Sequence, residues 1–332
     1  MAMVVSVLVL ISIFLPVTLT LVLNVEAVQN VIVKRASAFA TEYLGTRVEV
    51  GRIDLDLFSR VRVTDFYVED HAQDTILYVE RAWASIRSLN IAEDGLLLGM
   101  AKAENGEFNL RELEDGELNI RPIVGRLQRP DAKGNFRMVI GNIDASGLTF
   151  RYERLEHRDP EYGIDYYDME IADIDVEIDD FSVDKARVWA DIRSLSAREK
   201  SGFIIGNLTT KFLVDMGEIA FEEFALTTPT SHIVVPEFRL LGGDWTRYKE
   251  FIHNVKMVGR VENSSLSTDD LAYFAPAMRT WKTSVSGVDA SFDGVVSNFE
   301  GVVSRATIAE RVRRWQRLGL RVCLIGAHRS MS

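Results

Sequence analysis

Cysteine is nearly absent from this chain of 332 residues, because Cys323 is its only one. An internal disulfide is therefore impossible, and a thiolate metal site would need other ligands as well. The low count excludes a fold held together by disulfides. It leaves the redox compartment open, since periplasmic proteins can also lack disulfides.

Motifs for catalysis or metal binding are scarce. No Gly-rich phosphate loop, G-x-S-x-G elbow or dinucleotide fingerprint occurs, and the five histidines are far apart. Ser182 and Lys185 match the short S-x-x-K pattern of acyl-serine enzymes, but the pattern falls between two expected strands instead of at a helix start. The acidic residues of 173–180 alternate with apolar ones, which places the carboxylates on a solvent-facing side. We therefore expect no catalytic, cofactor-binding or metal site, and no enzyme.

Positive charge is in the minority, with 38 Lys and Arg against 49 Asp and Glu and a net charge of -11. Phosphate binding by a nucleic-acid protein needs a basic face, so we expect no nucleic-acid partner. Hydrophobic residues make up 47% of the chain, which predicts a folded protein with room for a large core or several repeated units.

Residues 1–25 carry no charged side chain and are dominated by Val, Leu and Ile. A helix of this length can cross roughly 30 Å of hydrocarbon, and we interpret the segment as a single transmembrane anchor. A cleaved signal peptide fits less well, because its apolar region is typically about 7 to 15 residues and follows Lys or Arg. Lys34 and Arg35, read by the positive-inside rule alone, would place the rest of the chain in the cytoplasm.

Residues 26–45 predict a short amphipathic helix that ends at Gly45. Its expected apolar face consists of Val25, Val28, Ile32, Ala36, Phe39, Ala40 and Tyr43. Such a helix either lies on the membrane surface or closes the end of a following sheet, and we favour the second arrangement.

From residue 46 the apolar period changes from 3.6 to 2, which is typical of half-buried strands. Val48 and Val50 alternate with polar residues, and the alternation slips in phase at Gly51-Arg52, which indicates a bulge or bend. The same alternation returns near residues 136–140, 148–152, 174–178, 203–214 and 255–261. Turn pairs such as Asn105-Gly106 and Asp115-Gly116 are expected between strands. Ser267 or Thr268 predicts the start of one further helix, which Pro276 ends.

These features predict a mainly β fold: a transmembrane helix and a short amphipathic helix, followed by a long, curved antiparallel sheet over residues 46–304. An antiparallel sheet has one apolar face, which a second sheet, helices or a ligand must cover. We expect this face to form an open hydrophobic groove that binds lipid. The residues expected to line it are Ile140, Phe150, Phe203, Ile205, Phe212, Val214 and Met257.

The order of several short segments is similar to that in the N-terminal part of TamB-type translocation and assembly module proteins, which belong to the AsmA-like group. After the apolar anchor, the segments are 36–55, 68–70, 74–78, 195–203, 226–231, 269–271, 274–276 and 294–299. Each segment alone is short. Their shared order over residues 1–304 carries the resemblance.

This resemblance implies an inner-membrane, single-pass protein of a Gram-negative cell, with residues 46–304 in the periplasm despite Lys34 and Arg35. It implies a role in outer-membrane biogenesis, without a catalytic residue, as a scaffold that binds or conducts phospholipid along a β-groove. The implied partners are the inner membrane, phospholipid and an outer-membrane assembly protein. Two alternatives stay open: a scaffold that assembles outer-membrane or autotransported proteins, and a membrane-tethered hydrolase.

Residues 305–332 depart from the pattern of the TamB-type proteins. The alternation stops after Ser304, and seven arginines follow within a short tail that also contains Cys323. Proteins of that family are several times longer and end in a C-terminal domain. We interpret the tail as the product of a frameshifted or truncated gene; the alternative is a native basic amphipathic helix.

Overall fold

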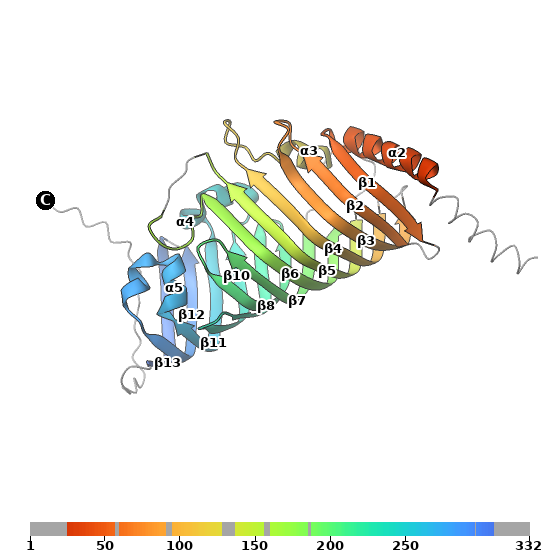
Figure 1. Ribbon diagram of the computed structural model, residues 1–332. Coiled ribbons are helices and arrows are strands. Elements are labelled where there is room, and N and C mark those ends of the chain that lie inside the picture. Colours follow the sequence, from red (N-terminus) through yellow and green to blue (C-terminus); the bar gives the residue numbers. More distant parts are fainter. Residues whose placement is uncertain are drawn as a thin grey trace, which may run out of the picture. The chain divides into compact units, whose positions relative to one another are not determined.

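The computed structural model describes residues 25–56, 60–90, 95–127, 137–155, 160–184, 187–295 and 297–308. Within these ranges the chain is mainly β, and its thirteen strands follow one another in sequence order in one sheet (Figure 1). The chain divides into two compact units, and the boundary between them falls inside β6 (Asp168–Asp184). The first unit holds the residues up to 158 and 167–174, and the second holds 159–166 and the residues from 175 on.

The elements of the first unit that precede β6 are α2 (Glu26–Leu44), β1 (Val48–Asp56), β2 (Arg60–Glu69), β3 (Thr75–Asn90), β4 (Gly95–Arg111), α3 (Arg121–Leu127) and β5 (Arg137–Glu153). No helix in the described ranges is long and apolar enough to cross a membrane. The predicted anchor lies outside these ranges, apart from Val25, which directly precedes α2.

One pair of strands contradicts the expectation of a wholly antiparallel sheet. β4 and β5 are parallel, with Gly95 opposite Arg137 and Arg111 opposite Glu153. The connection between them contains α3. Parallel strands need such a crossover, because the chain must return to the end of the sheet where β4 began before β5 can start. Alternation of apolar residues reports the face of a strand but not its direction, so the sequence pattern carried no sign of this crossover.

The five strands β1 to β5 are interrupted at one shared position, which we call the corner row. It consists of Gly51, Asp65, Glu80, Asn105 and Gly147. Ladder pairs form on both sides of each of these residues but not at the residue itself. Asp65, Asn105 and Gly147 have φ of 52°, 54° and 64°, in the left-handed region that breaks the extended pleat. The phase slip predicted at Gly51-Arg52 is thus the first member of a row that spans five strands.

Asn105 belongs to this row, and Asn105-Gly106 is not the turn that the sequence predicted. Both residues lie inside β4, and the amide nitrogen Nδ2 of Asn105 donates a hydrogen bond to Glu80 on β3 at 2.6 Å. Asn tolerates the left-handed conformation, and this tolerance makes it common in turns and also serves at a bend within a strand. The other predicted turn, Asp115-Gly116, lies in a turn, and Gly116 has φ of 77°.

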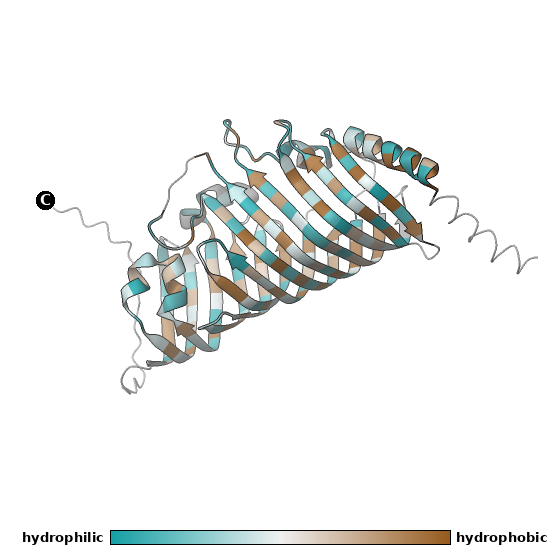
Figure 2. Ribbon diagram, viewed as in Figure 1, coloured by the Kyte–Doolittle hydropathy of each residue, from teal (hydrophilic) through white to brown (hydrophobic). Residues whose placement is uncertain are grey.

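The apolar residues of a strand occupy every second position, and at the corner row they switch from odd to even positions or the reverse. On β2, Val61 and Val63 precede the row and Phe66 and Val68 follow it, so two residues separate Val63 from Phe66. The register keeps the apolar residues of neighbouring strands opposite one another on both sides of the row. Figure 2 shows the resulting bands of hydrophobic and hydrophilic residues along the strands.

Helix α2 lies along the outer edge of β1 (Figure 1). The backbone N–H of Val48 donates to Thr41 Oγ1 at 3.0 Å, and the N–H of Val50 donates to Ser37 Oγ at 3.2 Å. These bonds satisfy edge groups that would otherwise be open to another strand. Gly45, with φ of 73°, ends the helix as predicted, because glycine adopts this conformation without strain.

The face that α2 turns to the sheet is rotated from the predicted one. Phe39 and Tyr43, both expected on the apolar face, are 69% and 54% exposed and stack on each other with ring centroids 6.0 Å apart. Ser37 and Thr41 lie on the inner face instead, because the edge of β1 offers them hydrogen bonds. The apolar periodicity predicted the helix. It could not predict which face meets β1, because the unpaired N–H groups of that strand bind hydroxyl groups.

The second unit contains, after β6, the elements β7 (Arg187–Glu199), β8 (Ile204–Asp215), β9 (Glu218–Thr227), β10 (His232–Leu241), the 3-10 helix η2 (Trp245–Glu250), α4 (Phe251–Asn254), β11 (Lys256–Ser267), α5 (Thr268–Phe274), the 3-10 helix η3 (Pro276–Thr280), β12 (Ser284–Val295) and β13 (Asn298–Ile308). Ser267 caps α5 as predicted, accepting a hydrogen bond from the N–H of Asp269 at 3.1 Å.

Strand β13 continues beyond the predicted domain boundary at Ser304. Arg305 lies within it and pairs with Asp289 of β12, with Nε and Oδ2 2.8 Å apart. Residues 309–332, the rest of the predicted basic tail, lie outside the described ranges.

Candidate functional site

One part of the apolar face in the first unit is covered by helices, and we call it the helix-covered segment. It comprises Val48 and Val50 of β1, Phe66 and Val68 of β2, Leu77 and Val79 of β3, and Phe108 of β4. Val48 and Val68 are 2% and 4% exposed. Ile123 of α3 joins them in one core cluster, and Ala40 and Leu44 of α2 pack against it. Val48, Val68 and Ile123 therefore form a buried core, and the other residues of the segment are half-buried around it.

The apolar face on the other side of the corner row has a different character, and we call it the alanine segment. It comprises Ile53, Val61, Val63, Ala82, Ala84, Ala101, Ala103, Ile143 and Ala145. Except for Ala145, these side chains are only half-buried. Four alanines on the neighbouring strands β3 and β4 leave a hollow of about 290 Å³, bordered by Val61, Val63 and Ile143.

The chemistry of the alanine segment is that of an apolar binding surface. Small side chains at its centre and larger ones at its rim form a shallow trough, and Ala carries no polar atom to direct a ligand. Hydrocarbon placed there would gain roughly 0.8 kcal/mol for each CH₂ group removed from water. The arrangement can hold a flexible apolar chain. Among the residues that line the hollow, Lys102 is the one with an ionisable side chain.

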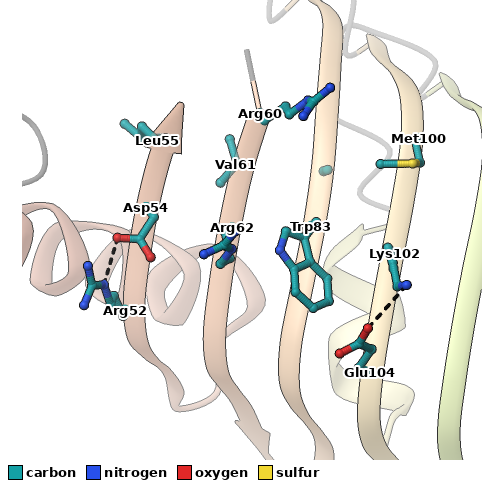
Figure 3. A pocket seen from close by; sticks show the side chains of 11 residues that line it. Arg52, Asp54, Leu55, Arg60, Val61, Arg62, Trp83, Met100, Lys102 and Glu104 are labelled. Carbon is teal, nitrogen blue, oxygen red and sulfur yellow. Dashed lines mark hydrogen bonds and ion pairs between the residues drawn. The ribbon is translucent and has the colours of Figure 1, made fainter. Parts of the chain in front are cut away.

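A second hollow, of about 590 Å³, is lined mainly by polar side chains of the same strands, and its apolar lining residues are Leu55, Val61, Ala84 and Met100. Figure 3 shows its charged and aromatic side chains: Arg52 and Asp54 on β1, Arg60 and Arg62 on β2, Trp83 on β3, and Lys102 and Glu104 on β4. The register places Trp83 between Arg62 and Lys102 in one row across the sheet. The Arg62 guanidinium carbon is 5.9 Å from the centre of the indole ring, within reach of a cation–π contact.

Asp54 connects this polar hollow to α2. Its Oδ1 accepts a hydrogen bond from Arg52 Nε at 2.8 Å and one from Gln29 Nε2 at 3.0 Å. Burial raises the pKa of Asp54, but the hydrogen bonds from Arg52 and Gln29 outweigh that effect, so the pKa lies below its ordinary value. The carboxylate therefore stays ionised and keeps Arg52 neutralised.

An aromatic row crosses one face of the second unit. It runs from Phe212 on β8 through Phe221 on β9 and Phe238 on β10 to Phe292 on β12, with successive ring centroids 5.3, 5.7 and 5.8 Å apart. All four side chains are half-buried. Spacings of this size match the stacked and edge-to-face contacts that aromatic rings prefer. The row is therefore a second continuous apolar surface.

Gly259 of β11 makes that row possible. It lies between Phe238 and Phe292 in the register, and a Cβ at this position would approach the Phe292 ring to 2.5 Å. Without a side chain at 259, the Phe292 ring reaches across β11 to Phe238.

The structure brings several predicted groove residues onto shared faces. Phe212 and Val214 are two residues apart on β8 and so share a face. Met257 lies on the same face, because directly paired residues share a face and the pairs Val214–Ile219, Ile219–Leu240 and Leu240–Met257 connect it to β8. Ile205 is half-buried on β8, and in the first unit Ile140 and Phe150 both lie on β5. Ile140 is 7% exposed, whereas Phe150 is half-buried and contacts Phe108 at 6.0 Å between ring centroids.

Phe203 differs from the other predicted groove residues. It lies just before β8 and is 6% exposed. Its ring packs edge-on against Tyr273 and Phe274 of α5, with centroids 5.6 and 5.0 Å away. This residue anchors a helix and leaves little surface for a ligand.

The alanines of the first unit were missing from the sequence-based candidates. Ala82 and Ala84 do alternate with polar residues, but a small side chain such as alanine is a weak sign of an apolar face. For the acidic stretch, the structure agrees with the prediction: Asp175 and Glu177 are exposed on β6, and Val176 and Ile178 are half-buried. Within the described ranges, no group of three His, Cys, Asp or Glu residues could hold a metal ion.

Comparison with known proteins supplies no family for this chain. No family model matches it, and no curated protein matches it significantly.

Proposed function

We propose that this chain is a membrane-anchored scaffold that binds phospholipid and conducts its acyl chains along the apolar face of the sheet, in the service of outer-membrane biogenesis. The observation that carries this proposal is the alanine segment. Its residues are apolar and, except for Ala145, half-buried, and most of them border a hollow of about 290 Å³. Contiguous apolar surface that no other element covers usually marks a binding site, and helices cover only the neighbouring segment.

The corner row supports a groove. At the corner row each of the five strands has one residue without a ladder pair, and the strands stay one-for-one in register on both sides of it. Asp65, Asn105 and Gly147 leave the extended conformation there, which bends their strands. The groove requires the apolar face to be the concave side of this bend, where more of an acyl chain is removed from water than on a flat face.

The placement of the scaffold follows from the sequence before α2. Residues 1–25 are uncharged, and α2 starts at Glu26, directly after them. We propose a single-pass anchor in the inner membrane with the sheet in the periplasm, in keeping with the resemblance to TamB-type proteins. The amphipathic helix would then join the anchor to the sheet through its bonds with β1.

Lipid extraction and mass spectrometry on the detergent-purified full chain test this function. We expect phospholipid to co-purify with the wild type and to fall several-fold in Ala103→Asp, which places a charge in the hollow. Thr64→Asp is the matched control, because it adds the same charge on the polar face. The proposal fails if no phospholipid co-purifies, or if both variants retain as much as the wild type.

The two ends of the strand order favour a second candidate function, that of an assembly scaffold for outer-membrane proteins. The edge of β1 is bonded to α2, whereas β13 is the last strand in the order of the described residues. An open edge can take a strand from an unfolded client. A photo-crosslinker at Val302 of β13, which is 49% exposed, should then capture an unfolded outer-membrane strand peptide. Absence of capture would remove this candidate.

A further inference from the structure

The polar hollow of the first unit differs in charge from the rest of the chain. Four cationic side chains and two carboxylates line it, whereas the whole chain has a net charge of -11. Arg52 is 2.8 Å from Asp54, and Lys102 is 3.3 Å from Glu104 and 3.5 Å from Asp144. Arg62 faces Asp54 in the register and interacts with it electrostatically. Cationic side chains still outnumber carboxylates by four to two among the residues that line the hollow, so the hollow is locally positive.

Trp83 adds an amphipathic ring to this charge. It is half-buried beside Arg62 on the polar face, where an aromatic side chain of this size gains little from the core. Trp next to Arg is a composition favoured at the level of lipid headgroups, because the indole is apolar with one polar N–H. Guanidinium groups bind phosphate oxygens through two parallel hydrogen bonds.

The hollow also lies at the end of α2 that is nearest the proposed anchor. Gln29, in the first turn of the helix, donates a hydrogen bond to Asp54 at 3.0 Å. Asp54 is the direct register partner of Arg62. The helix begins at Glu26, so the point where residues 1–25 join the fold is about one helical turn from Gln29.

We propose that this hollow is the surface through which the first unit meets the membrane, and that Arg60 and Arg62 bind the phosphate groups of anionic phospholipids there. This proposal rests on the proposed membrane anchor. A free nucleotide suits the hollow less well, because Arg62 already lies over the one aromatic ring that lines it. A nucleic acid would meet the negative net charge of the remaining chain.

The test uses the full chain in nanodiscs, with a photo-crosslinker in place of Met100. Met100 lines the hollow and is 38% exposed, so a large apolar replacement is tolerated. The probe lipids are phosphatidylglycerol and phosphatidylcholine. We expect adducts with phosphatidylglycerol in excess over phosphatidylcholine, and a fall of about fivefold or more in Arg60→Gln with Arg62→Gln. Millimolar inorganic phosphate should leave the adducts unchanged.

Two controls make the result specific. A crosslinker in place of Met216, which is 82% exposed in the second unit, should give no preference for phosphatidylglycerol. Arg193→Gln with Arg260→Gln removes the same charge from exposed, ion-paired positions and should leave the Met100 adducts intact. Equal adducts in the Arg60 and Arg62 variant would overturn the proposal, and displacement by free phosphate would overturn the assignment to lipid. The lipid that co-purifies with these variants reports separately on the proposed carrier function.

Discussion

The helix-covered segment lies on β1 to β4 and the alanine segment on β1 to β5, and both show the same alternation, yet helices bury the centre of one and not of the other. Val48 and Val68 are almost fully buried because Ile123, Ala40 and Leu44 pack against or join their cluster. No described helix residue belongs to a core cluster with Ala82 or Ala103. Apolar alternation alone therefore marks a face that needs a cover, and the neighbouring elements decide whether the protein supplies it.

The largest expected effect is the difference in stability between an aspartate placed in the helix-covered segment and one placed in the alanine segment. Val68→Asp places a charge in the buried core, and we expect a loss of about 4 kcal/mol or more in the free energy of unfolding. Ala103→Asp leaves the carboxylate hydrated, and we expect a loss below about 1 kcal/mol. Urea denaturation of the two variants measures both. Equal losses would show that the alanine segment is packed core.

The next effect concerns the two faces of α2. Leu44 packs against the core cluster, so Leu44→Ala should cost about 1 to 3 kcal/mol, at the lower end because the side chain is half-buried. Phe39→Ala removes a larger side chain that is 69% exposed and should cost less than about 0.5 kcal/mol. Thermal unfolding distinguishes these outcomes. A larger loss from Phe39→Ala would mean that the helix packs by the face predicted from its periodicity.

Much of the fold was predictable from local patterns, and the limits have physical reasons. The end of α2 at Gly45 and the start of α5 at Ser267 follow from residues that act within one turn. The bend at Gly51 was visible as a phase slip. Its continuation through Asn105 was not, because Asn-Gly favours both a hairpin turn and a left-handed bend, and only the pairing of neighbouring strands decides between them.

The candidate site was less predictable than the fold. Phe212 and Met257 do share a face of the second unit, because alternation determines the face. Phe203 obeys the same alternation but is buried by Tyr273, a residue seventy positions away. A pattern confined to one strand cannot report which distant helix will cover it.

A smaller effect tests how α2 protects the edge of β1. Thr41 accepts from the N–H of Val48 at 3.0 Å and donates to its carbonyl at 3.3 Å. Thr41→Val keeps the shape and removes both bonds, so we expect a loss of about 1 to 2 kcal/mol. The Val48 amide should also exchange its hydrogen faster. Unchanged exchange at Val48 would show that α2 does not protect this edge.

The smallest effect is a pH dependence confined to the end of α2 that lies beside the alanine segment. The pKa of Asp54 is below its ordinary value of about 4, because hydrogen bonds from Arg52 and Gln29 outweigh burial. A lowered pKa means that this stabilisation is present above the ordinary value and is lost as the pH falls through the lowered one. Acid should therefore release Gln29 while Ser37 and Thr41, which do not titrate, keep the other end of the helix on β1. Hydrogen exchange, corrected for its intrinsic pH dependence, should rise in the first turns of α2 and not in the last. Asp54→Asn should abolish this difference between the two ends, and equal acceleration along the whole helix would refute the assignment to Asp54.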